Sequence, residues 1–165
     1  MKSSNRFALL ATVVVGLSSL SSVALAASVN GTANAQVLAP IVVTVGAPLN
    51  FGTIAGNAAG TVIIAASGGA RTFSGGVVGT SAASGAGAFT LTGTTGNTFA
   101  ITLPGTALTV VSGANSMGYT VTASAATGSI VAGAAAFTVG GTLSVGLNQA
   151  VGSYTGQYPV TVEYN

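Results

Sequence analysis

Alternation of side chains with a period of two is the strongest constraint in this sequence, and it is clearest in residues 152–165. The even positions of this C-terminal segment are glycine, aromatic or aliphatic: Gly152, Tyr154, Gly156, Tyr158, Val160, Val162 and Tyr164. A period of two places even and odd positions on opposite faces of a β-strand. We therefore predict a long C-terminal strand with one face against a core. Pro159 lacks an N–H and so marks this strand as an edge strand, or as bulged at that point.

A second alternating segment occupies residues 28–37, near the opposite end of the chain. Its even positions carry serine, threonine, asparagine and glutamine, and its odd positions form a row of small apolar residues: Val29, Gly31, Ala33, Ala35 and Val37. A strand with such a row on one face fits a narrow groove. Pro40 follows and interrupts the pattern. We expect residues 27–38 to be an extension that is separable from the domain after it.

Short β-type segments separated by turn signals fill the rest of the chain. They are rich in β-branched and aromatic residues and are bounded by glycine, proline or asparagine. The clearest lie at residues 41–45, 49–54, 60–65, 89–92, 98–103, 108–111, 117–122 and 135–147. Gly140 and Gly141 are expected to kink the last of these or to form a bulge. Because no capped segment of helical period occurs, we predict an all-β domain over residues 39–165, built as a sandwich or closed barrel.

The N-terminal residues 1–26 have the features of a signal peptide. Lys2 and Arg6 precede an apolar run over residues 7–17, and residues 24–26 form a small-x-small cleavage site. Serines interrupt the apolar run too early for a membrane span. We therefore expect an exported protein, periplasmic, surface-bound or extracellular, with no membrane span in its mature chain.

The composition argues against catalysis and against most ligands. Charged residues are 2% of the chain, and there is no histidine, cysteine or tryptophan. Acid–base and nucleophilic catalysis need a titratable base, and metal sites need several His, Cys or carboxylate ligands. After residue 26 the charges are Arg71 and Glu163, so no basic patch is present for nucleic acid. We expect no enzyme and no cofactor, and a neutral surface favours association with other chains.

Arg71 and Glu163 have two interpretations. They could form an ion pair between strands or between subunits, or they could be two solvated side chains of small energetic weight. The tyrosines at 154, 158 and 164 share one face, so they could contact a ligand, but core packing is the simpler interpretation.

Four short motifs resemble an uncharacterised family of small secreted bacterial β-domains, known only as a domain of unknown function. These motifs are LNFGT at 49–53, FTLTG at 89–93, FAITLP at 99–104, and GSYTG at 152–156 with its continuation to Tyr164. The layout is more distantly similar to chaperone–usher fimbrial subunits, including the spore-coat-U-like group. Those proteins share an alternating N-terminal extension, an L-x-F-G strand and a final strand with an opening glycine and a penultimate tyrosine, here Gly152 and Tyr164. Many of them carry a disulfide, whereas this chain has no cysteine.

This resemblance implies an immunoglobulin-like antiparallel β-sandwich that is completed by a donated strand. Residues 28–38 of one subunit would complete the next subunit by strand addition, and Val29 to Val37 would be the candidate donor strand. The C-terminal strand would be the candidate acceptor edge. The implied partners are copies of this chain or related subunits, together with a periplasmic chaperone.

The leading hypothesis is therefore a non-enzymatic, pilin-like subunit of a bacterial surface fibre (a fimbrium). One alternative is a self-contained secreted or surface β-domain with an adhesive, binding role, whose N-terminal strand pairs within its own sheet. A small outer-membrane β-barrel also suits a terminal aromatic-rich strand, but the strands are short and aromatic girdles are absent.

Overall fold

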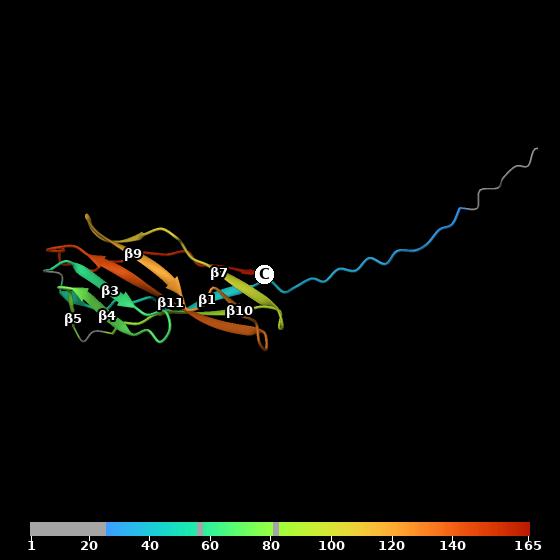
Figure 1. The fold of residues 1–165 in the computed structure, drawn as a ribbon, viewed down its shortest axis with the longest axis horizontal. Helices are drawn as coiled ribbons and strands as arrows, with labels where there is room; N and C mark the ends of the chain where they lie inside the picture. Colours follow the sequence, from blue (N-terminus) through green and yellow to red (C-terminus); the bar gives the residue numbers. More distant parts are fainter. Residues whose placement is uncertain (1–25, 56–57, 81–82) are drawn as a thin grey trace, which may run out of the picture. The chain divides into compact units, whose positions relative to one another are not determined.

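The computed structural model describes residues 26–165 except 56–57 and 81–82, and the predicted signal peptide lies almost wholly outside the described residues. The described residues form strands and no helix (Figure 1). The strands are β1 (Val42–Ala47), β2 (Ile54–Ala55), β3 (Gly60–Ile64), β4 (Arg71–Gly75), β5 (Val78–Gly79), β6 (Gly87–Thr92), β7 (Thr98–Thr102), β8 (Leu108–Ser112), β9 (Asn115–Ala123), β10 (Thr127–Ser129), β11 (Ala134–Val145) and β12 (Thr161–Tyr164). The predicted all-β class is confirmed.

The strands pair antiparallel in three sheets that make a sandwich-like arrangement. The largest has the order β1-β6-β11-β3-β4, and β9 pairs with β11 and with β8. A smaller sheet has the order β10-β7-β12, and β2 pairs with β5 in a short ribbon. The compact unit that holds these sheets comprises residues 36–165, and the described residues before it, 26–35, are exposed and carry no strand.

β11 is the strand on which the large sheet is assembled. Its first half pairs with β6, from Ala134 opposite Thr92 to Val139 opposite Gly87. Its second half pairs with β3, and residues 139–143 also pair with β9. One edge of β11 is therefore shared by β6 and β3 in succession, while β9 takes the other edge.

The core lies between the layers and is built from alternate residues of the paired strands. Phe89 of β6 stacks on its cross-strand partner Phe137 of β11, with ring centroids 5.1 Å apart. The fully buried side chains are Val62, Ile64, Leu91, Ile130 and Val139. Every described charged residue stays outside this core, which is apolar apart from the tyrosine hydroxyls.

Two predicted strands and one predicted bulge differ from the structure. The C-terminal strand is regular only over Thr161–Tyr164, with one isolated bridge at Thr155, because Pro159 cannot donate a ladder hydrogen bond. The segment predicted at residues 49–54 has a single bridge at Asn50 before β2. The expected bulge at Gly140–Gly141 is absent, since the β11 register is continuous there, and the irregularity falls between Val45 and Ala47.

Gly140 is required where β3 ends against β11. A Cβ added to Gly140 would collide with Ile64 O and Ala66 N, both main-chain atoms that cannot turn aside. Gly118 on β9 is a matched site, because a Cβ there would meet only Leu108 O at 3.9 Å.

We expect Gly140→Ala to lower the free energy of unfolding of residues 27–165 by about 2–3 kcal/mol, as overpacking does elsewhere. Gly118→Ala should leave it within about 0.5 kcal/mol. Urea unfolding followed by tyrosine fluorescence measures both. Equal effects of the two substitutions would contradict this account of the β11–β3 junction.

Candidate functional site

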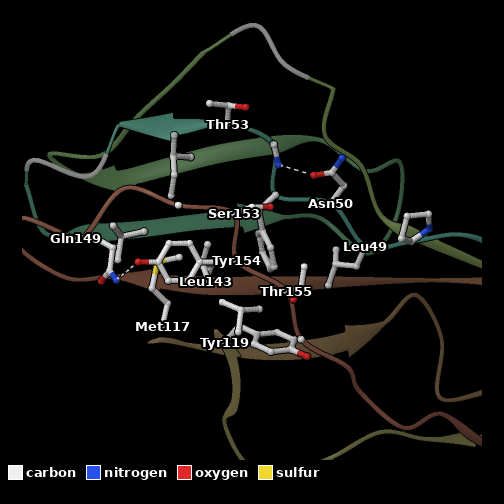
Figure 2. Close-up of a pocket in the computed structure, with 18 of the residues that line it drawn as sticks. Leu49, Asn50, Thr53, Met117, Tyr119, Leu143, Gln149, Ser153, Tyr154 and Thr155 are labelled. Carbon is white, nitrogen blue, oxygen red and sulfur yellow. Dashed lines mark hydrogen bonds between the residues drawn. The ribbon is translucent and has the colours of Figure 1, made fainter. Parts of the chain in front are cut away.

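An open cavity of about 860 Å³ lies between two irregular segments of the chain. One wall is residues 48–54, which follow β1, and the other is residues 149–158, which connect β11 to β12. The floor consists of buried residues from β8, β9 and β11: Val110, Met117, Tyr119, Leu143 and Val145. In Figure 2, Thr53 lies at the top of the view with Asn50 and Leu49 to its right, Ser153, Tyr154 and Thr155 run through the middle, and Met117 and Tyr119 lie below them. We call this cavity the groove.

The first wall is held from the side that faces away from the groove. Asn50 exchanges two main-chain hydrogen bonds with Gly85, at 2.9 Å each. The main-chain N–H of Gly52, a residue with φ of 76°, donates to Asn50 Oδ1 at 2.8 Å. Thr53 O accepts a hydrogen bond from Thr80 N at 3.0 Å. Leu49 and Phe51 of this wall pack against the core.

The second wall is held by β8. Thr155 exchanges main-chain hydrogen bonds with Val111, with Val111 N to Thr155 O at 2.8 Å and Thr155 N to Val111 O at 3.0 Å. In an antiparallel pair the main-chain groups of successive residues point to opposite sides. Those of Tyr154 and Gly156 therefore point away from β8. This edge can accept a further strand.

The two amide side chains that line the groove are already engaged. Gln149 Nε2 donates to Tyr154 Oη at 2.8 Å and to Ser116 O at 3.3 Å, and Tyr154 Oη donates to Ala150 O at 2.7 Å. Asn50 Oδ1 accepts from Gly52, as described. A ligand in the groove would therefore meet aromatic and aliphatic surface at the floor, together with the side-chain hydroxyls of Thr53, Ser153 and Thr155 at the walls.

Two apolar side chains on the inward face of β1 are also exposed. Val43 and Val45 are cross-strand partners of Leu91 and Phe89 and so share their inward face. Leu91 and Phe89 are 1% and 6% exposed, whereas Val43 and Val45 are 36% and 63% exposed. Val43 and Val45 thus face inward but are not covered by other side chains, as their cross-strand partners are.

Tyr119 is the polar residue of the groove floor. It is 3% exposed, and its hydroxyl has no hydrogen-bond partner among the described residues. Burial raises its pKa above the ordinary value for tyrosine. Burial, and then the proximity of Tyr119, raises the pKa of Tyr158 as well. Both hydroxyls are therefore uncharged at neutral pH.

The structure places the first half of the predicted C-terminal row, as far as Tyr158, at the groove, whereas Val162 and Tyr164 lie on β12 beside β7. Tyr154, Tyr158, Val160, Val162 and Tyr164 are partly buried and pack against the core, while Gly152 is exposed at the rim. Tyr158 contacts Phe89 edge to face, at a centroid distance of 6.2 Å. Tyr164 Oη donates to Ala39 O and accepts from Thr94 N, both at 2.7 Å.

The predicted N-terminal row forms no strand in the single chain, and its members Val29 and Val37 are each 95% exposed. Sequence reasoning missed the first wall and the floor as parts of a site. The LNFGT motif was the available signal for the wall. The floor residues gave none, because Met117 and Leu143 look like any inward-facing residues of a strand.

The interpretation of Arg71 as a solvated side chain is wrong, because its guanidinium donates to two main-chain carbonyls. Glu163 is exposed on β12, opposite Ala100 of β7.

Residues 41–164 match a family described as a domain of unknown function (DUF4402). The chain belongs to this family. No curated protein and no solved structure matches it. The family match begins at Ile41, so the alternating row at residues 29–37 lies before the shared domain.

The part of the chain that the structure describes has no apolar helix of membrane-spanning length. Within that part, no three potential metal ligands of the His, Cys, Asp or Glu type come together.

We expect Tyr154→Phe and Tyr119→Phe to change the free energy of unfolding differently, although each removes one hydroxyl at the groove. Tyr154→Phe loses two hydrogen bonds and should lower the free energy of unfolding by about 1–2 kcal/mol. Tyr119→Phe loses no hydrogen bond and should leave stability unchanged or higher. Urea midpoints at pH 7 measure both, and a larger loss for Tyr119→Phe would contradict the assignment.

Proposed function

We propose that this chain is a non-enzymatic structural subunit of a bacterial surface fibre, and that residues 28–38 of one copy cover the inward face of β1 and fill the groove of the next. In this proposal the domain is an immunoglobulin-like sandwich that lacks one strand. The observation that carries the proposal is the exposure of Val43 and Val45 on the inward face of β1. Inward-facing residues of a complete sandwich are covered by the opposite layer.

The chemistry of the groove supports a strand as its occupant. A strand brings its own main-chain donors and acceptors, which suit the free edge at Tyr154 and Gly156. It also brings one row of side chains, which suits an apolar space.

Residues 28–38 have the side chains that such a space accepts. Rings already crowd the walls and floor at Phe51, Tyr119, Tyr154 and Tyr158. The row between Val29 and Val37 is glycine or alanine, which leaves room for close approach. The even positions would face water with hydroxyls and amides.

Insertion into a second copy is favoured over insertion into the same copy. The chain enters its domain at Ala39, whose N–H donates to Thr94 Oγ1 at 2.8 Å and whose carbonyl accepts from Tyr164 Oη. To reach its own groove, the segment would have to reverse direction at residues 39–41, where Ala39 is held and Pro40 restricts the chain. A strand donated between copies needs no reversal.

The proposal places the mature chain outside the cytoplasm, with a periplasmic chaperone that covers the groove before assembly. The low charge of the chain supports the need for such a chaperone. Charged residues usually protect exposed strand edges from pairing, and few are present here.

We expect residues 27–165 to form oligomers in native mass spectra, and residues 39–165 to be monomeric and less stable. A peptide of residues 28–38 should bind the truncated chain one to one and raise its free energy of unfolding by about 2.7 kcal/mol at a hundredfold excess over Kd. Ala33→Asp in the peptide should abolish this effect, because it places a charge in the apolar row. Thr32→Asp, on the opposite face, should retain it.

A truncated chain that is as stable as the longer one, with no response to the peptide, would contradict strand complementation. A monomeric longer chain that loses stability on truncation and regains it with the peptide would show insertion within one copy. That result would contradict the fibre and favour the self-contained binding domain.

A further inference from the structure

We propose that Arg71 is a positioning residue for strand insertion, and that it holds the first wall of the groove at the spacing that an incoming strand requires. This inference rests on the proposed function. In the pairing of β4 with β3, Arg71 lies opposite Ile64. Ile64 is 1% exposed, so the partly exposed Arg71 projects from the inward face of its strand, at the border of the core.

The guanidinium of Arg71 ties three segments together. Its Nη1 donates to Phe51 O at 3.2 Å and its Nη2 donates to Thr80 O at 2.7 Å. Its Cζ lies 5.0 Å from the centroid of the Phe73 ring, which is a cation–π distance. Phe51 belongs to the groove wall, Thr80 follows β5, and Phe73 belongs to the edge strand β4.

Gly52 completes the arrangement. A Cβ at Gly52 would collide with Arg71 Nη1, so the guanidinium occupies the space that any other residue would fill with its side chain. Gly52 also has a φ of 76°, which suits glycine. The LNFGT turn and the arginine therefore fit each other, although they are far apart in the sequence.

The wall needs this contact because regular pairing is sparse there. Between the end of β1 and the start of β2, the bridge of Asn50 to Gly85 is the one ladder contact among the described residues. The carbonyl of Phe51 lies just beyond this bridge. A planar guanidinium donates to two carbonyls at fixed angles, whereas a lysine ammonium acts as a single point charge.

The test measures subunit exchange between assemblies of residues 27–165, with subunits distinguished by isotope labelling and native mass spectrometry. We expect Arg71→Met assemblies to exchange at least about tenfold faster than wild type, since charge-assisted hydrogen bonds at the wall are lost. Arg71→Lys should give an intermediate rate. Thr138→Val is the matched control, because it removes the hydrogen bond of Thr138 Oγ1 to Ala66 O away from the groove and should leave exchange unchanged.

Hydrogen exchange supplies a readout that general destabilisation would not reproduce. In both Arg71 variants, the amides of residues 51–54 should exchange faster, while those of the β9–β11 ladder should keep their protection. If Arg71→Met does not fold, the subunit-exchange rate and the hydrogen exchange of Arg71→Lys are compared with those of wild type, and this comparison tests the role of Arg71.

The outcomes separate the two proposals. Wild-type chains that never assemble would contradict the fibre subunit itself. Wild-type chains that assemble, with Arg71 variants exchanging at the wild-type rate, would overturn the role of Arg71 and leave the fibre subunit standing. An equal acceleration by Thr138→Val would also overturn it, because the effect would then follow stability alone.

Discussion

The double pairing of β11 is the constraint on which the rest of the structure depends. Its first half continues the β1–β6 layer, and its second half lies between β3 and β9. Gly140 makes the change possible, because only a residue without a Cβ lets the main chain of β3 and the residues after it approach so closely. The two groove walls are bonded to different neighbours, the first to Gly85 just before β6 and the second to Val111 of β8.

A domain built in this way has packing and main-chain hydrogen bonds as its main sources of stability. With 2% charged residues and no cysteine, ion-pair networks and disulfides contribute nothing to it. Its edges consequently lack the charges that usually prevent strand pairing. This composition is the basis in the sequence for the proposed association through strands.

The sequence predicted the fold class because alternation and turn residues report local geometry directly. The parity of the C-terminal segment agrees with the burial of Tyr154, Tyr158 and Tyr164. Strand continuity was less predictable, because Pro159 ends the ladder on its N-terminal side while the alternation continues through it. The groove could not be predicted, since it forms where two irregular segments that are far apart in the sequence, residues 48–54 and 149–158, come together over the core, and such an approach leaves no pattern in a sequence. Arg71 was misjudged because its partners are main-chain carbonyls, which sequence reasoning does not see.

The central claim is that residues 28–38 of one copy lie against the inward face of β1 in another. Two chains of residues 27–165, one carrying Ala33→Cys and the other Val45→Cys, test this claim most directly, because the natural chain has no cysteine to interfere. After mixing and mild oxidation, we expect a covalent heterodimer from this pair and little from Thr32→Cys with Val45→Cys, since residue 32 faces away. A chain with both Ala33→Cys and Val45→Cys that closes only within itself, or equal yields from positions 32 and 33, would contradict the account.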